Sequence, residues 1–223
     1  MKKYCNFVAS FYEDLLMELI ISKYSYINNP LVSVNGKPFA TINEPEKGKF
    51  LTALYRKLNL DYPKFFKMDT LSKLAFLASE LILKDSEQRF VPREDGAIIC
   101  FNRSSSLEAD TLFQSSLAED HFFPSPSIFV YTLPNIATGE MAIRNKFLGE
   151  TAFYLSEKCD PEQIFRTVNV AFQNNKINFA LVSWVESVEA ACVTLMLLVE
   201  KKTGKHAIPF SIRHIVELFN NRL

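Results

Sequence analysis

The chain has few of the residues on which several common kinds of site depend. Its 223 residues include only six glycines, three histidines, four cysteines and one tryptophan. Neither glycine-rich phosphate-binding pattern occurs, G-x-G-x-x-G or G-x-x-x-x-G-K-[ST], and the G-x-S-x-G turn of the serine hydrolases is also missing. These absences exclude nucleotide-binding loops of the two kinds and that hydrolase elbow.

Histidine and cysteine are too scattered to predict a metal centre. No two histidines stand at the spacing of metal ligands, and no C-x-x-C pair occurs, so we expect neither a metal nor a cofactor. Three of the cysteines lie in apolar runs, which is typical of buried free thiols in a reducing compartment. The four are Cys5, Cys100, Cys159 and Cys192.

Charge and hydropathy exclude two further classes. The 25 basic residues balance 25 acidic ones, which argues against a broad nucleic-acid-binding surface. The longest apolar run, Val193–Val199, is far shorter than the ~20 residues of a membrane span. Acidic residues interrupt the apolar stretch behind the basic N-terminus, and no small-residue cleavage site follows. We therefore expect a cytoplasmic protein without a signal peptide.

The chain is rich in phenylalanine, with 20 residues, which predicts a large core, an apolar partner surface, or both. Short continuous apolar runs at 96–101, 179–185 and 193–199 are typical of buried strands, and 20–27 and 150–155 also favour strands. Helical spacing predicts helices over 7–19, 50–58, 69–84, 107–117, 132–145, 160–173 and 211–219. This alternation favours one α/β domain spanning residues 1–223, with a mixed, mostly parallel sheet and helices on both faces.

Local signals define several element boundaries. Asn35-Gly36 between two apolar segments predicts a hairpin turn, and Thr203-Gly204 predicts another turn. Asp69 and Ser211 are candidate N-caps. Asp160-Pro161-Glu162-Gln163 combines an N-cap, a proline at the first helical position and a partner for a capping box.

Residues 125–149 read SPSIFVYTLPNIATGEMAIRNKFLG. This segment resembles the β-ketoacyl synthase pattern S-P-x-F…L-P-N-x-x-x-G-x-(I/M)-A-I-R…G. Upstream, Phe66–Asp69 and the following helix resemble the family's R-R-M-D…S-x-x-A-x-x-A. Downstream, Asn178–Glu186 resembles its D-x-A-L-A-G-G-x-E strand. The likeness covers about residues 60–190, whereas 1–45 match poorly, and its motif residues are Pro134, Asn135, Gly139, Arg144, Gly149 and Glu186.

The resemblance implies the N-terminal half of a thiolase-like fold with a degenerate nucleophile. Without a gap between Gly149 and Glu186, Lys158 occupies the position of the family's nucleophilic cysteine, and Cys159 is one residue late. The family's catalytic histidines belong to a second half that this half-length chain does not contain. The helix start after Cys159 would lower the pKa of its thiol, which keeps open an acyl-accepting half-enzyme using histidines from another chain. Asn135, Gly139 and Gly149 also have a purely structural interpretation, as a helix-end contact and two close backbone approaches.

The resemblance further implies a partner. Some type II polyketide systems pair an active ketosynthase with a similar subunit that has lost its cysteine, the chain-length factor. Half-length versions that resemble this chain accompany aryl-polyene or flexirubin-type pigment synthesis. The hypothesis is thus a non-catalytic, chain-length-factor-like subunit in type II fatty acid, polyketide or aryl-polyene synthesis. It would form a heterodimer with a full-length ketosynthase, or a homodimer. The predicted interface comprises Phe129, Tyr131, Leu133, Ile136, Phe153, Tyr154 and Leu155.

A docking module for an acyl carrier protein is a further alternative. Its basic residues would be Lys64, Lys67, Arg144 and Lys146, which could meet an acidic carrier surface.

Overall fold

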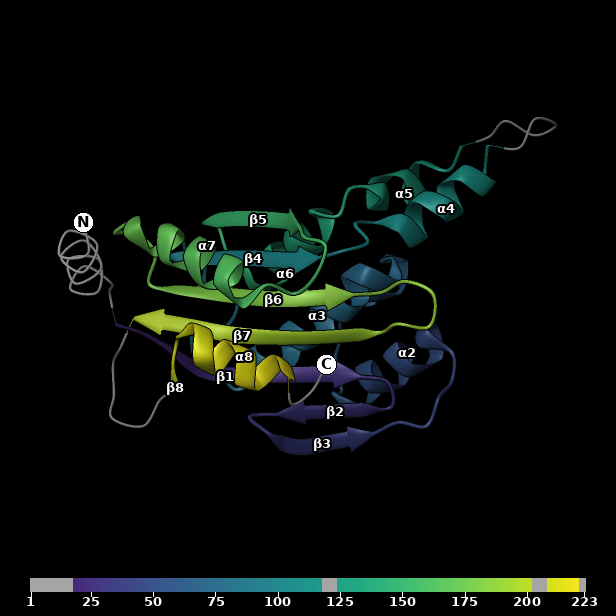
Figure 1. The fold of residues 1–223 in the computed structure, drawn as a ribbon. Helices are drawn as coiled ribbons and strands as arrows, with labels where there is room; N and C mark the ends of the chain where they lie inside the picture. The colour runs from purple at the N-terminus through teal and green to yellow at the C-terminus, as the bar shows by residue number, and fades with distance from the viewer. Residues whose placement is uncertain (1–17, 118–123, 202–207, 221–223) are drawn as a thin grey trace.

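The computed structural model describes residues 18–117, 124–201 and 208–220, and Figure 1 shows their arrangement around one mixed sheet. The strand order is β3-β2-β1-β7-β6-β4-β5, with β8 beside β1. The strands are β1 (Leu19–Asn28), β2 (Leu31–Val34), β3 (Lys37–Thr41), β4 (Gly96–Asn102), β5 (Glu150–Leu155), β6 (Phe179–Glu186), β7 (Val193–Lys201) and β8 (Ile208–Pro209). The predicted strands and the α/β class are confirmed.

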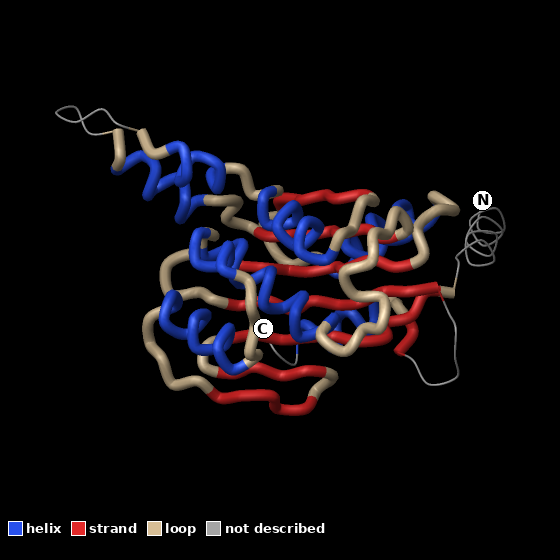
Figure 2. Tube along the Cα trace, turned by 180° about the vertical axis from the view of Figure 1, so that it is seen from behind, coloured by secondary structure: helices blue, strands red, loops and turns tan. Residues whose placement is uncertain are grey.

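Helices cover both faces of this sheet. Seen in Figure 1, α7 and α8 lie in front, and Figure 2 shows the other helices from behind. The helices are α2 (Lys47–Lys57), α3 (Thr70–Leu83), α4 (Leu107–Ser115), α5 (Pro126–Phe129), α6 (Ile136–Asn145), α7 (Pro161–Gln173) and α8 (Ile212–Asn220), with 3-10 turns η1 (Pro63–Lys67) and η2 (Val130–Thr132). No helix among these described residues is long and apolar enough to cross a bilayer.

The prediction of a mostly parallel sheet is wrong. Only the β4–β5 and β4–β6 pairs are parallel, and the other pairs are antiparallel. The reason is the short connection between β6 and β7, because a few residues can reverse a chain but cannot carry it back to start a parallel neighbour. Buried on both faces, β6 and β7 have the continuous apolar sequence that favoured parallel strands.

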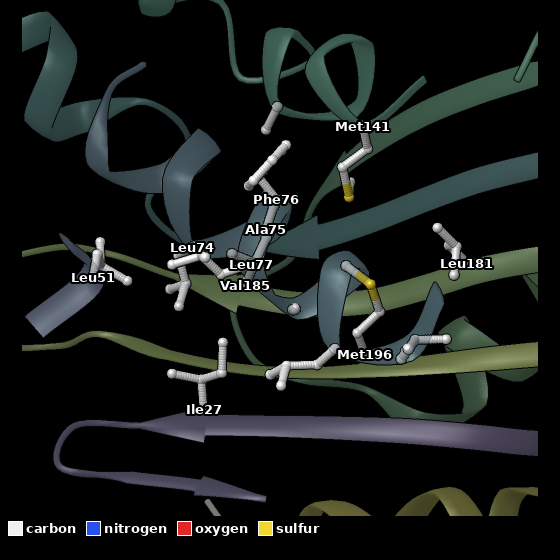
Figure 3. Packing of buried hydrophobic residues seen from close by; sticks show 14 of the residues in the cluster. Ile27, Leu51, Leu74, Ala75, Phe76, Leu77, Met141, Leu181, Val185 and Met196 are labelled. Atoms are coloured by element: carbon white, nitrogen blue, oxygen red, sulfur yellow. The ribbon is translucent and has the colours of Figure 1, made fainter. Parts of the chain in front are cut away.

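Each face of the sheet has its own core. One core lies under α2, α3 and α6, and Figure 3 labels Leu74, Phe76, Met141 and Leu181 among its buried residues. The other lies under α7 and α8, where Ile164, Val168 and Phe172 form the buried side of α7. The 3.6-residue period of α7 places these three side chains on one stripe, so burial on the sheet follows from the sequence.

The local boundary signals act largely as predicted. Asn35 and Gly36 have φ angles of 50° and 77°, which the two-residue hairpin turn requires. Asp69 accepts a hydrogen bond from the Ser72 N–H at 3.0 Å, and Asp160 caps α7 through the N–H groups of Glu162 and Gln163.

Three boundary predictions differ from the structure, and two more fall outside the described residues. The Gln163 side-chain oxygen accepts a hydrogen bond from the Ser156 hydroxyl, so Gln163 does not complete the predicted capping box. Helix α2 begins three residues earlier than predicted, and α6 begins four residues later, after the turn η2. The predicted helix over 7–19 and the turn at Thr203-Gly204 lie outside the described residues.

Candidate functional site

The two edge strands of the sheet, β3 and β5, differ in the features that prevent pairing with a strand of another chain. At one edge, β3 contains Lys37 and Pro38, and its register with β2 shifts by a bulge. Lysine, proline and bulges are the devices by which edge strands avoid pairing. At the other edge, β5 has the sequence ETAFYL and none of these devices. The β5 edge is therefore the edge that a strand of another chain can join.

The backbone of β5 directs alternate hydrogen-bonding groups outward. Just beyond the strand, the Ser156 N–H donates to the Asn102 carbonyl of β4 at 2.9 Å. Because orientation alternates along a strand, the N–H groups of Thr151, Phe153 and Leu155 point away from β4. This side of β5 offers a row of donors and acceptors to a partner strand.

Exposed apolar side chains gather in the same part of the chain. Among the described residues, seven of the fifteen large hydrophobic residues that are exposed lie between positions 129 and 155. Exposed apolar side chains are typical of an interaction surface where they adjoin one another. The seven are Phe129, Val130, Leu133, Ile143, Leu148, Tyr154 and Leu155.

The residues predicted for a partner interface take different positions around this edge. Phe129, Leu133 and Leu155 are more than half exposed, at 53%, 52% and 57%. Phe153 is half-buried against the core under α3 and α6, and Tyr154 stacks on Phe101 with ring centroids 5.2 Å apart. Ile136 is half-buried at the start of α6.

Tyr131 is turned inward. Its hydroxyl donates to a carboxylate oxygen of Glu140 at 3.1 Å, and burial together with this neighbour raises the pKa of Tyr131. Glu140 is itself buried and pairs with Lys64 at 2.7 Å. Tyr131 therefore fixes η2 to α6 instead of pointing its hydroxyl to a partner.

Helices α4 and α5 with η2 form an arm that leans away from the ends of β4 and β6 (Figure 1). Within the arm, the ring centroids of Phe113 and Phe129 lie 5.2 Å apart.

The carboxylates of Glu186 and Glu108 connect the base of the arm to the rest of the chain. Glu186, at the end of β6, accepts hydrogen bonds from the Arg103 N–H at 3.0 Å and from the Ser104 hydroxyl.

Glu108 is the second anchor of the arm. It pairs with Lys47 of α2 at 2.8 Å and accepts hydrogen bonds from the hydroxyls of Ser187 and Thr70 at 3.2 and 3.3 Å. The arm's first turn is thereby tied to α2, to the start of α3 and to the β6–β7 loop. This anchoring residue was not predicted, because its partners come from distant parts of the sequence.

A groove of about 1150 Å³ lies between the arm and the start of α3. Burial raises the pKa of Asp69 and lowers the pKa of Lys73 on its wall, so both charged forms are disfavoured there. Its apolar lining comprises Met68, Leu107, Ala109, Leu112, Ile128, Tyr131 and Val188.

Lys158 and Cys159 lie between β5 and α7. Lys158 is exposed, whereas the Cys159 side chain packs against the core under α7. Burial, aided by the neighbouring Asp160 carboxylate, raises the pKa of Cys159 to about 12. The prediction that the helix start lowers this pKa is therefore wrong, because burial desolvates the thiolate and the Asp160 carboxylate disfavours its charge.

We expect Cys159 to be nearly inert toward alkylation at neutral pH. Only the thiolate attacks, and a rise from 9.0 to about 12 reduces its fraction about 1000-fold below that of an unperturbed thiol. The iodoacetamide reaction at Cys159, followed by peptide mass spectrometry, should accelerate about tenfold per pH unit from pH 7 to 10. A rate at pH 7 equal to that of a free cysteine in a peptide would contradict this burial.

The glycines of the resemblance have different roles. A Cβ on Gly149 would lie 2.1 Å from the Gly96 carbonyl oxygen, so a close backbone approach requires glycine there. A Cβ on Gly139 would meet nothing within 4 Å, and the predicted close approach is absent from the described structure. Pro134 and Asn135 begin α6 through their carbonyls, which accept from the N–H groups of Ala137 and Gly139 at 3.2 and 3.1 Å.

Arg144 is half-buried, and its guanidinium is fully engaged within the chain. It pairs with the fully buried Glu80 at 3.0 Å, and its guanidinium lies 4.7 Å from the ring centroids of both Tyr62 and Phe90. Arg89 pairs with the same carboxylate. Of the four basic residues predicted to meet a carrier protein, Arg144 is half-buried and paired with Glu80, and Lys64 is paired with Glu140. Lys67 and Lys146 are exposed.

No group of three His, Cys, Asp or Glu residues in the described ranges is arranged to hold a metal ion. The β5 edge and the exposed apolar side chains are features that support association through backbone pairing and apolar contact.

Comparison with known proteins shows which fold the chain has. No family model and no curated protein matches the chain. A structure described as the ishigamide ketosynthase/chain length factor matches it with a TM-score of 0.60 and 16% identity, over 86% of this chain and 64% of that chain. The chain has the ketosynthase fold.

Two further structures agree. A ketosynthase (ApeO) in complex with its chain length factor (ApeC) from Xenorhabdus doucetiae gives a TM-score of 0.53 at 14% identity, over 84% of this chain and 81% of that one. A β-ketoacyl synthase from Burkholderia phymatum gives 0.58 at 13%, over 83% and 59%. The chain thus spans about 60% of the length of the first and third of these ketosynthase-fold chains.

Proposed function

We propose that this chain is a non-catalytic, chain-length-factor-like subunit that pairs with a ketosynthase in type II fatty acid, polyketide or aryl-polyene synthesis. The observation that carries the proposal is the β5 edge, which is apolar and unprotected while the opposite edge at β3 is protected. The printed descriptions of two similar structures name a ketosynthase together with a chain length factor. We therefore propose a ketosynthase as the partner that joins the β5 edge.

The nucleophile region supports a non-catalytic role. Acyl transfer needs a thiolate that is both exposed and stabilised, because only the thiolate carries the acyl chain. Lys158, at the expected nucleophile position, is exposed, and the adjacent Cys159 thiol has a pKa of about 12. The alternative of a half-enzyme acylated on Cys159 would have to overcome this desolvation.

The test is the solution mass of the chain alone and after co-expression with a full-length ketosynthase from the same genome. Multi-angle light scattering should show a one-to-one complex after co-expression. A stable homodimer that ignores the ketosynthase would refute the proposal. Acylation of Cys159 by an acyl-thioester substrate, detected by intact mass, would favour the half-enzyme instead.

A further inference from the structure

A small cavity is lined by the loop at residues 86–93, by the last residues of α3 and α6, and by residues of β6 and β7. Its volume is about 50 Å³, whereas about 10–15 Å³ suffices for one water molecule. Six of its ten lining side chains are polar or charged: Ser86, Gln88, Arg89, Arg93, Asn145 and Glu200. The cavity can therefore hold a small polar ligand.

Asn145, the last residue of α6, presents an acceptor without a partner at this cavity. Its Nδ2 donates to the Met141 carbonyl at 2.9 Å, which fixes the amide orientation, because a flipped amide would bring two oxygens together. The Asn145 side chain is fully buried, and its Oδ1 has no hydrogen-bond partner among the described residues. A buried acceptor without a partner costs free energy, so we expect a donor to be bound beside it.

Arg89 presents a donor without a partner at the same cavity. Its guanidinium pairs with the fully buried Glu80 carboxylate and lies 4.5 Å from the ring centroid of Phe90. These contacts hold the Arg89 side chain in place with 11% of its surface exposed. Its Nε has no hydrogen-bond partner within the described part of the chain. The cavity thus borders both an acceptor and a donor that lack partners.

We propose that this cavity binds at least one ordered water molecule, which donates a hydrogen bond to Asn145 Oδ1 and accepts one from Arg89 Nε. Water fits because a single molecule supplies both a donor and an acceptor. Ser86 and Gln88, which also line the cavity, offer it further partners. The site lies within one chain, so this inference does not depend on the proposed partner.

The charges around the cavity favour a neutral ligand over an ion. An anion would face the carboxylate of Glu200, and a metal cation would face the guanidinium groups of Arg89 and Arg93. The bound water would join the end of α6 to the loop beside Phe90, whose φ angle of 66° is unfavourable for a bulky side chain. We therefore expect the water to help hold this loop in its conformation.

The experiment counts long-lived internal water molecules by magnetic relaxation dispersion of the water oxygen, in wild type and in two variants. Asn145→Leu keeps the approximate volume of the side chain and removes the acceptor, so it should lose at least one such water molecule. Asn169→Leu on α7 is the matched control. Asn169 donates an equivalent hydrogen bond to the carbonyl four residues earlier, that of Phe165 at 2.8 Å, but does not line the cavity. Its water count should equal that of wild type.

A second measurement needs no substitution and decides the question even if Asn145→Leu fails to fold. The Arg89 Nε–H of the wild-type chain should show a nuclear Overhauser effect to a long-lived water molecule. Absence of this effect would overturn the inference, as would equal water counts in wild type and a folded Asn145→Leu variant. An equal loss in both variants would also overturn it, because the loss would then not depend on the cavity.

Discussion

Thr151→Pro is expected to weaken the complex with the ketosynthase at least 100-fold while leaving the chain folded. The Thr151 N–H points away from β4, so proline removes a donor from the partner's side of β5 and none from the β4 ladder. Proline is tolerated on an edge strand when its nitrogen faces outward. Its ring also obstructs the approach of the new strand. Binding would be measured by isothermal titration or by the dissociation rate of the purified complex.

The matched control for this prediction is Thr151→Val, which keeps the N–H and the branched side chain at the same exposed position. It should bind like wild type. Ala152→Pro would serve as the opposite case, because its N–H faces β4 and its loss should destabilise the sheet itself. Tight binding by a folded Thr151→Pro variant would show that β5 does not pair with the partner.

Gly149→Ala is expected to destabilise the chain by about 3 kcal/mol or more. The added Cβ would lie 2.1 Å from the Gly96 carbonyl oxygen and 2.8 Å from that of Glu94. Both obstacles are backbone atoms at the start of β4, so relief requires β4 and β5 to separate. Urea unfolding followed by circular dichroism would measure the change in the free energy of unfolding.

Gly48→Ala provides the control for that measurement, since its Cβ meets nothing within 4 Å. It should change the free energy of unfolding by no more than about 1 kcal/mol, in the stabilising direction. A Gly149→Ala variant as stable as wild type would mean that these backbones are not in such close contact.

Several features of this protein could be read from its sequence because they depend on neighbouring residues. The caps at Asp69 and Asp160 and the turn at Asn35-Gly36 depend only on local geometry, and the structure confirms them. The buried strands were predicted because burial on both faces requires a continuous apolar sequence. The resemblance in residues 125–149 led to the ketosynthase fold, which the comparisons show.

Other features depend on which segments fold against one another. Strand direction could not be read from β6 and β7, because the same apolar run suits a parallel or an antiparallel neighbour. The pKa of Cys159 follows from its burial under α7, and the ion pair of Arg144 follows from the meeting of α3 and α6. Desolvation and ion pairing are set by distance in space, which local sequence does not encode.

The sequence by itself determined the class of the fold, the ends of several elements and the segment in which an interface is expected. Only the tertiary structure decided that β5 is an edge strand of the described sheet and that Tyr131 turns inward to Glu140. It also decided that a Cβ on Gly139 would meet none of the described residues within 4 Å. The physical reason is that the exposure of a side chain is set by how the whole chain packs. Whether an apolar residue becomes core or surface depends on what covers it, and its covering elements come from distant parts of the sequence.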